Sequence, residues 1–171
     1  MAGRNTAYAM SQVKNVRWSS EQSTPQRWWG RLIDMSEADV QLFQTWAEQL
    51  AIAEDPLDFW YENVWAEDID HRAVEVAPDD HGPIIGRDAM RAYVADWYEM
   101  FPDLTISFED ITDAGPGRVI AVSHIAGTAR ASSVPTELRF AIVWTIRDGK
   151  IVRGREYWTR SEALKAVGPK E

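Results

Sequence analysis

The chain has no cysteine among its 171 residues. This absence excludes disulfide bonds, thiolate nucleophiles and zinc sites built on cysteine. No apolar run approaches the roughly 20 residues that a helix needs to cross a bilayer, and the first residues lack the apolar core of a secretory signal peptide. The sequence therefore predicts a cytoplasmic protein with no membrane as a partner.

Basic residues are few relative to acidic ones. Lys and Arg together number 18 against 27 Asp and Glu, which gives a net charge of −9 at pH 7. Such a charge disfavours phosphate backbones and anionic lipid surfaces as ligands, so nucleic acid is not expected as a partner. The apolar fraction of 45% and the charged fraction of 26% are typical of one globular domain with a real core.

Tryptophan, in contrast, is abundant, with nine residues in the chain. Flat aromatic walls are one way to build a pocket for a ring-shaped ligand. A core and a dimer interface that happen to use tryptophan would give the same count. The composition leaves both interpretations open.

The first 35 residues differ from the rest of the chain. Residues 1–35 show no sustained periodicity and carry five basic residues against two acidic ones. We expect a basic, tryptophan-containing arm here, followed by one domain over residues 36–171. The arm is either a flexible tail or a segment that docks on the body or on a partner subunit. The tryptophans available for docking are Trp18, Trp28 and Trp29.

Three helices are predicted before the main run of strands. Ser36, followed three residues later by Asp39, is a capping signature and predicts a helix start at Ser36. Asp55 and Pro56 are a second start signal, with an N-cap followed by proline at the first helical position. Residues 87–101 have one apolar face at helical spacing and predict a third helix.

Strands dominate the second half of the sequence. The dipeptide Asp-Gly within "RDGK" lies between two apolar runs and is the strongest short hairpin signal. A short helix over 161–167 ends the pattern. Because helices come first and strands afterwards, we predict an α+β fold in which helices cover one face of a curved antiparallel sheet. The predicted strands span 68–76, 104–114, 117–130, 136–146 and 151–158.

The order of these elements is similar to that of the ketosteroid-isomerase-like, or nuclear transport factor 2, superfamily, and within it the chain resembles the SnoaL-like polyketide cyclase family. The likeness covers residues 37–168 and is carried by "DDHGPIIGRDAMRAYVADWYEMFPDLTISFED", "HIAGTAR" and "WTIRDGKIVRGREYWTRSEALKAVG". The resemblance implies a cone-shaped sheet wrapped around three to four helices, a deep apolar pocket, and a homodimer formed through the outer face of the sheet. The superfamily includes isomerases, hydrolases, cyclases, dehydratases and non-catalytic binders, so the fold does not fix the function.

Glu156 is the first candidate for a catalytic acid or base. Strand periodicity places Gly154, Glu156 and Trp158 on one face of the last strand. The resemblance adds that limonene epoxide hydrolases present a pocket aspartate from this position, and phenazine-biosynthesis proteins a glutamate from a similar Arg-Glu-aromatic stretch. Burial against tryptophan would favour the protonated form of this carboxyl, as proton transfer needs. The alternative is a surface charge at the strand end, paired with Arg153, Arg155 or Arg139.

His71 and Tyr93 are the candidates for assisting Glu156. Ile69 and Ala73 share the face of His71, so this imidazole points inward if the strand is regular. An imidazole facing a pocket is a second acid–base group, although a core histidine bonded to the backbone fits the pattern as well. By resemblance, Tyr93 lies near the place of a pocket histidine in the phenazine proteins and could donate a hydrogen bond to a ligand oxygen.

Other residues are candidates for the walls of the pocket. Trp97 lies four residues after Tyr93 on the same helix, where such a pair is also typical of a plain core. The three histidines lack the spacing of metal ligands, so no metal site is expected, and the acid–base chemistry implied by the resemblance uses no cofactor. The ligand-binding candidates are Trp60, Trp97, His124, Ile142, Trp144 and Trp158.

Three positions depart from the best-known relatives. The catalytic aspartate of ketosteroid isomerases matches Ala73 or its neighbours, and their oxyanion-hole aspartate matches Ile142. Many SnoaL-like chains have an aspartate just after the aromatic residue of the last strand, where this chain has Thr159.

Two hypotheses for the function follow. The first is cofactor-free acid–base chemistry on a small hydrophobic, cyclic molecule (cyclisation, isomerisation, dehydration or hydrolysis). The second is a non-catalytic ligand-binding or dimeric scaffold module.

Overall fold

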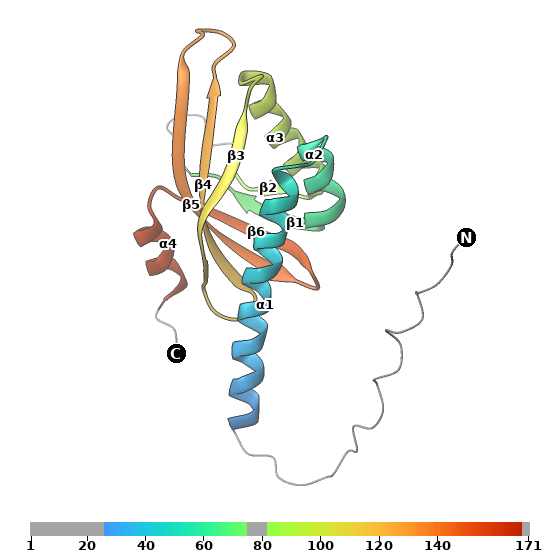
Figure 1. Cartoon of the computed structure of the whole chain (residues 1–171), viewed down its shortest axis with the longest axis vertical. Coiled ribbons are helices and arrows are strands. Elements are labelled where there is room, and N and C mark those ends of the chain that lie inside the picture. The colour runs from blue at the N-terminus through green and yellow to red at the C-terminus, as the bar shows by residue number, and fades with distance from the viewer. Residues whose placement is uncertain (1–25, 75–81, 169–171) are drawn as a thin grey trace, which may run out of the picture.

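The computed structural model describes residues 26–74 and 82–168, and only the backbone of residues 26–36. Within these ranges it has an α+β fold of four α-helices, one π-helix and a six-stranded sheet (Figure 1). The elements are α1 (Gln26–Leu50), α2 (Pro56–Phe59), η1 (Trp60–Val64), β1 (Trp65–Arg72), β2 (Ile84–Ile85), α3 (Arg87–Met100), β3 (Thr105–Asp113), β4 (Arg118–Thr128), β5 (Pro135–Arg147), β6 (Lys150–Tyr157) and α4 (Arg160–Val167).

The first helix starts earlier than the capping signature at Ser36 predicts. α1 begins at Gln26, directly after Pro25, so Ser36 lies in its interior. A serine inside a helix lowers the stability of the helix by only a few tenths of a kcal/mol relative to alanine. Most of the residue types in positions 26–35 are also tolerated in helices. The N-terminal part of α1 extends beyond the sheet (Figure 1). The first 25 residues of the predicted arm, including Trp18, lie outside the described residues.

The second start signal is confirmed. The Asp55 carboxylate accepts the backbone N–H of Asp58 at 2.9 Å, and Pro56 occupies the first turn. The helix then widens into η1, whose Trp60 and Val64 are buried. This widened turn ends at β1, which begins at Trp65 rather than at residue 68 as the sequence pattern predicts.

The sheet is mixed, not wholly antiparallel. Its strand order is β2-β1-β6-β5-β4-β3. The predicted meander from β3 to β6 is antiparallel throughout, but β1 pairs with β6 in parallel. Hairpins fix the direction of consecutive strands, whereas β1 reaches β6 only through long-range packing, which sequence periodicity does not encode. β2 and β3 form the two edges, so the sheet is open.

The two faces of the sheet are covered by different helices. Ile142 and Trp144 of β5 point to the inner face, where they join the main core with Phe43 of α1. The alternate residues Ala141 and Val143 point to the outer face, where Ala163 of α4 packs against them. This alternation is the period of two that a strand imposes. The candidate site therefore lies on the inner face, between the sheet and helices α1 and α3.

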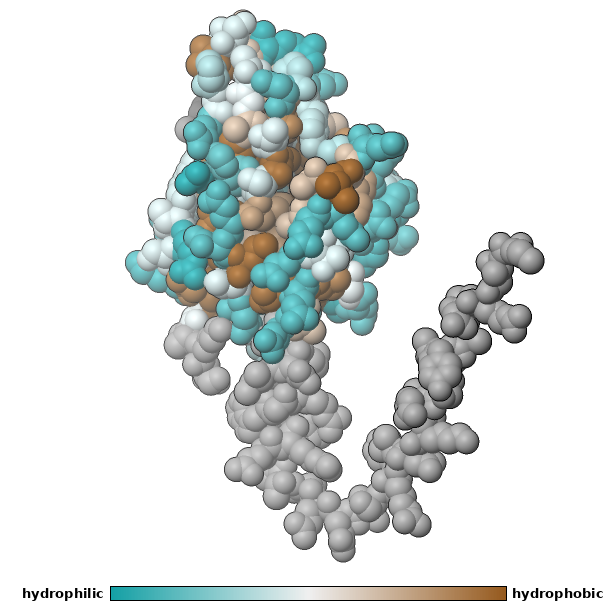
Figure 2. Space-filling model, viewed as in Figure 1, coloured by the Kyte–Doolittle hydropathy of each residue, from teal (hydrophilic) through white to brown (hydrophobic). Residues whose placement is uncertain are grey.

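The turn between β5 and β6 has the predicted hairpin geometry. Asp148 and Gly149 both have positive φ, at 52° and 70°, as a two-residue hairpin turn requires. On the face shown in Figure 2, apolar side chains reach the surface in small patches among hydrophilic ones. No helix in the described ranges combines the length and the apolar character that a bilayer crossing demands.

Candidate active site

A row of three residues crosses the inner face of the sheet. Gly154 of β6 pairs with Trp144 of β5 on one side and with His71 of β1 on the other. A Cβ atom on Gly154 would lie 2.2 Å from His71 Nδ1 and 2.6 Å from Trp144 Cζ3. The two rings therefore meet above a residue that has no side chain, and they stack with their centroids 5.6 Å apart.

Glu156 lies next to this row and interacts with His71. The His71 Nε2 atom is 3.0 Å from Glu156 Oε1, and the backbone N–H of Val74 donates to Oε2 at 3.0 Å. The side chains are well buried, with exposed fractions of 1% for His71 and 9% for Glu156. Each oxygen of the carboxylate thus has a partner, which fixes its orientation.

The strand pair that carries His71 and Glu156 is held together on the outer face by Arg155. Its Nη2 pairs with the Asp70 carboxylate, and its Nη1 donates to the Asp70 carbonyl at 2.8 Å. The hydrogen bond from Arg155, assisted by the charge of Arg153, lowers the pKa of the Asp70 carboxyl. Arg155 and Glu156 therefore point to opposite faces, and the alternative of a surface pair between them is wrong.

The imidazole and the carboxylate line a small cavity, which we call the inner pocket. Its volume is about 70 Å³. Besides Tyr93, the polar side chains in its described lining are His71, Ser123 and Glu156. The aromatic side chains of the inner pocket are Trp60, Trp65, Tyr93, Trp97, Phe108, Phe140 and Trp144, and its aliphatic ones are Met90, Val94, Ile106, Ile125 and Ile142.

Tyr93 faces the pair from α3. Its ring centroid is 5.9 Å from that of His71. Burial raises the pKa of the Tyr93 hydroxyl to about 12, the negative charge of Glu156 adds to this effect, and a hydrogen bond with Trp97 opposes it. The phenol therefore stays protonated at neutral pH and can donate a hydrogen bond inside the pocket.

Three nitrogens of pocket residues are buried without a partner in the described ranges. They are His71 Nδ1, Trp65 Nε1 and Trp144 Nε1. His71 Nδ1 faces Gly154, where no acceptor is available to it. A buried N–H without an acceptor costs about 1–3 kcal/mol, so we place the imidazole proton on Nε2, where it is donated to Glu156. No group of three metal-ligating side chains occurs among the described residues.

The fold brings most of the predicted site residues together. Glu156, His71 and Tyr93 all line the inner pocket, together with the wall candidates Trp60, Trp97, Ile142 and Trp144. The face predicted for His71 is confirmed, because Ile69 on the same side of β1 is also fully buried.

Two predicted ligand-binding residues lie elsewhere. Trp158 follows the last residue of β6, so strand alternation no longer governs it, and its exposed fraction is 45%. His124 of β4 lies between Ser123 and Ile125, which line the inner pocket, and it therefore points to the outer face. There its Nε2 lies 2.7 Å from Glu137 Oε1. Both residues are absent from the described lining of the pocket.

Sequence reasoning missed several residues of the pocket. Trp65 stacks on Trp60 with centroids 5.8 Å apart, but its position after a helical pattern gave no sign that a strand begins there. Ser123 is 2% exposed, and the alternation of β4 could have placed it on the same face as Val119 and Ala121. The backbone N–H of Val74 carries no sequence signal, because any residue type supplies it.

Comparisons with known proteins agree on the fold. The profile of the SnoaL-like domain matches residues 43–154. A crystal structure from Jannaschia sp. CCS1, assigned to the SnoaL-like polyketide cyclases, has 15% sequence identity and a TM-score of 0.59, and the alignment covers 88% of this chain and 100% of that one. No curated protein matches the chain by sequence.

Two further solved structures have the same fold. An NTF2-like protein of unknown function from Burkholderia pseudomallei K96243 has 16% identity, a TM-score of 0.56, and coverage of 77% of this chain and 98% of that one. RV0760c from Mycobacterium tuberculosis, solved in complex with estradiol-17beta-hemisuccinate, has 16% identity, a TM-score of 0.55, and coverage of 72% and 95%. Identities this low support the fold, whereas function has to come from the site.

Proposed function

The chain belongs to the SnoaL-like domain family, and from that premise we propose that it is an acid–base enzyme acting on a small, largely apolar molecule. Glu156 accepts and returns the proton, His71 positions the Glu156 carboxylate, and Tyr93 donates a hydrogen bond to an oxygen of the substrate. The proton is carried by side chains, so the proposed step needs no cofactor. Cyclisation and isomerisation through an enolate fit this arrangement best.

The observation that supports the proposal is the His71–Glu156 pair at 3.0 Å inside an aromatic pocket. A carboxylate held by one imidazole N–H and one backbone N–H keeps a fixed direction, and a base in a fixed direction needs no reorganisation during the reaction. By resemblance, the catalytic aspartate of ketosteroid isomerases matches Ala73 or its neighbours and their oxyanion-hole aspartate matches Ile142, so their mechanism does not transfer to this chain.

The proposed step balances without an outside reagent. Glu156 removes a proton from the carbon next to a carbonyl, the C–H electron pair moves into the enolate, and Tyr93 hydrogen-bonds to the enolate oxygen. The protonated Glu156 then returns the proton to carbon, at the same or a different atom. Proton transfer of this kind typically contributes 10²–10⁴-fold to a rate.

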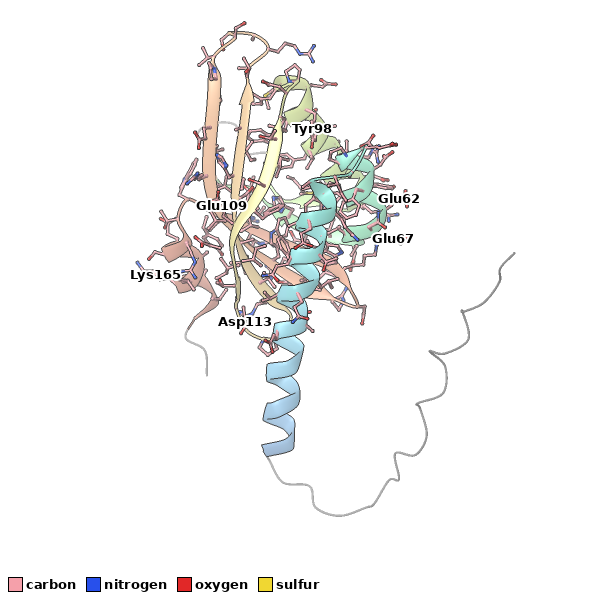
Figure 3. All side chains as sticks on the ribbon, in the orientation of Figure 1. Glu62, Glu67, Tyr98, Glu109, Asp113 and Lys165 are labelled. Carbon is pink, nitrogen blue, oxygen red and sulfur yellow. The ribbon has the colours of Figure 1, made fainter. Side chains whose placement is uncertain are left out.

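Hydrogen–deuterium exchange tests this step before the natural substrate is known. Loss of the α-proton signals of 2-butanone in D₂O is followed by ¹H NMR with the wild type and with Glu156→Gln. We expect the variant to exchange about 100-fold more slowly. Glu67→Gln is the matched control, because Glu67 lies on β1 with a side chain 91% exposed (Figure 3). Equal rates for the wild type and Glu156→Gln would contradict the role of Glu156.

A non-catalytic ligand-binding module is the second candidate. The tryptophans Trp60, Trp65, Trp97 and Trp144 all line the inner pocket, and its volume of about 70 Å³ is small compared with the ~150 Å³ engineered cavity that takes up benzene. A pocket filled in this way favours binding over turnover. In that case no ketone would show catalysed exchange, and Glu156→Gln would change ligand affinity little.

We also propose that the protein forms a homodimer and that it is located in the cytoplasm, as the sequence predicts. Two large apolar side chains are exposed beside the outer face of the sheet: Trp158, just before α4, and Leu164, within α4, with exposed fractions of 45% and 40%. Exposed tryptophan is enriched where proteins contact partners. Sedimentation of the full chain should give a dimer mass, and Trp158→Ser should shift the population toward monomer. A monomer at all concentrations would contradict the dimer.

A further inference from the structure

The inner pocket is too small to hold a cyclic molecule by itself. Its volume of about 70 Å³ is about half that of the engineered ~150 Å³ cavity that binds benzene. The inner pocket therefore has room beside Glu156 for only part of such a molecule. The rest of any apolar ligand must lie somewhere else.

A second and much larger hollow adjoins the inner pocket. This outer groove has a volume of about 830 Å³. Its described wall is formed by the residues after β1, by β2, by the C-terminal half of α3 and by the turn between β4 and β5. Its apolar side chains include Ile84, Met100, Phe101 and Ala131.

Two side chains of α3 belong to both hollows. Tyr93 and Trp97 line the inner pocket and also the outer groove, so they form the partition between the two. Trp97 is held on its groove side by Phe101, whose ring stacks on the indole with centroids 6.0 Å apart and an interplanar angle of 20°. A ligand that reaches Glu156 from the groove has to pass these two residues.

We propose that the ligand is elongated: its small polar head enters the inner pocket past Tyr93 and Trp97, and its larger apolar body lies in the outer groove. The proposal rests on the proposed function only for the role of Glu156 toward the head. The rest of the proposal is supported by the adjacency of the two hollows, which share Tyr93 and Trp97 in their linings, and by the difference between their volumes.

The charges around the groove define the ligand further. Asp96 and Glu99 are acidic and lie on its rim. The basic residue there, Arg130, is engaged with the end of α3: its Nε donates to the Glu99 carbonyl at 2.9 Å, and its backbone N–H donates to the Met100 carbonyl at 2.9 Å. With Glu156 at the inner end and a net charge of −9 on the whole chain, an anionic ligand is disfavoured. The ligand is therefore uncharged or cationic.

A series of 2-alkanones tests the proposal, because the head stays constant while the body grows. Calorimetric titration of the full chain with 2-butanone, 2-hexanone and 2-octanone gives the dissociation constants. Each methylene that the groove buries is worth up to about fourfold in affinity, so we expect 2-octanone to bind at least about tenfold more tightly than 2-butanone. Equal affinities across the series would overturn the proposal.

Variants locate the apolar body within the molecule. Ala131→Trp places an indole in the groove. It should weaken the binding of 2-octanone by about tenfold and change the affinity for 2-butanone by no more than about twofold. Ser132→Trp, at an exposed neighbour outside the described groove lining, is the control and should change neither. Met100→Ala removes an apolar wall side chain that is 49% exposed. It should weaken the binding of 2-octanone and leave the binding of 2-butanone unchanged.

The outcomes separate this proposal from the proposed function. If Ala131→Trp and Met100→Ala leave the affinity for 2-octanone unchanged, or if they weaken both ketones equally, the apolar body does not lie in the groove. If the affinities change as expected but Glu156→Gln exchanges the α-proton of 2-butanone as fast as the wild type, the groove proposal stands and the acid–base role of Glu156 falls.

Discussion

His71 and Glu156 are 85 residues apart in the sequence, yet the imidazole Nε2 and the carboxylate Oε1 lie 3.0 Å apart. The contact exists because β1 and β6 pair in parallel and because Gly154, which lies between His71 and Trp144, has no side chain. The other imidazole nitrogen, Nδ1, is buried and has no partner. The pair therefore has a direction: His71 donates and Glu156 accepts.

This direction predicts the tautomer of His71. At pH 8 we expect the proton on Nε2 and a bare lone pair on Nδ1, because a buried N–H facing Gly154 would lack an acceptor at a cost of about 1–3 kcal/mol. Long-range ¹H–¹⁵N correlation spectra distinguish the two nitrogens of each ring. A proton found on Nδ1 instead would contradict the positioning role that we assign to His71.

Gly154→Ala should disturb the site through a steric clash. The new Cβ would lie 2.2 Å from His71 Nδ1, and overpacking of this kind typically costs about 1–3 kcal/mol of the free energy of unfolding. Urea denaturation of Gly154→Ala, His71→Ala and the double variant gives the coupling between the two positions. We expect Gly154→Ala to lower the free energy of unfolding less in the His71→Ala background. Additive losses would show that the new methyl group does not clash with the His71 ring.

The raised pKa of Tyr93 predicts a loss of stability at alkaline pH. Its pKa is about 12 in the folded protein against 10.0 ordinarily, so the folded state holds the phenol proton more tightly. The resulting stabilisation is complete below pH 10 and is lost as the pH rises from about 10 to about 12, by about 1 kcal/mol per pH unit. Urea denaturation at pH 9 and pH 11 measures it.

Tyr93→Phe is the comparison for that titration. The variant should lose less stability than the wild type between pH 9 and pH 11, because it has no phenol to ionise at this position. Tyr98 on the same helix (Figure 3) also has a raised pKa, because it is partly buried, so part of the pH dependence should remain. An unchanged pH dependence in Tyr93→Phe would show that Tyr93 is not held in its protonated form.

Trp97→Ala should join the inner pocket to the outer groove. Removing the indole opens the partition, so a ring that the pocket of about 70 Å³ excludes can approach Glu156. We expect cyclohexanone to bind about tenfold more tightly to Trp97→Ala than to the wild type, as expected when a created apolar cavity is filled again. Ile52→Ala, which shortens an exposed apolar side chain outside the described linings of both hollows, is the control. No gain for Trp97→Ala would mean that the indole is not the barrier.

Asp70→Asn should weaken the side-chain contact that links β1 to β6. The charged hydrogen bond to Arg155 is lost, and because the Asp70 side chain is 36% exposed, solvent screening limits the cost to about 1 kcal/mol. The pKa of Asp70 is lowered in the folded state, so this stabilisation is present above the ordinary pKa of 3.8 and is lost as the pH falls below it.

Urea denaturation at pH 7 and pH 3 checks that expectation. The difference between the wild type and Asp70→Asn should shrink at pH 3. Asp68→Asn is the matched control: its partner Arg147 lies 3.1 Å away, but the two side chains are 70% and 62% exposed, and such surface pairs contribute little. A cost for Asp68→Asn as large as that for Asp70→Asn would contradict a special role for the Arg155 contact.

Local sequence signals predicted the elements that depend on neighbouring residues. The cap at Asp55, the hairpin turn at Asp148 and Gly149, and the alternation of β5 and β6 all follow from short stretches of chain. The start of α1 was predicted wrongly, because a capping signature at Ser36 is also tolerated inside a longer helix. Trp158 was assigned to the pocket because alternation was extended beyond the end of β6.

The sequence by itself determined which residue types the strands present to each face, since a strand's period of two is a local property. It therefore directed Glu156, His71 and Trp144 inward and Arg155 outward. Only the tertiary structure decided that β1 lies parallel to β6, that Gly154 lies beneath both rings, and that Tyr93 and Trp97 divide a small pocket from a large groove. Pairing between strands distant in sequence, and the volume left between packed side chains, depend on the whole core, and no short stretch of residues encodes them.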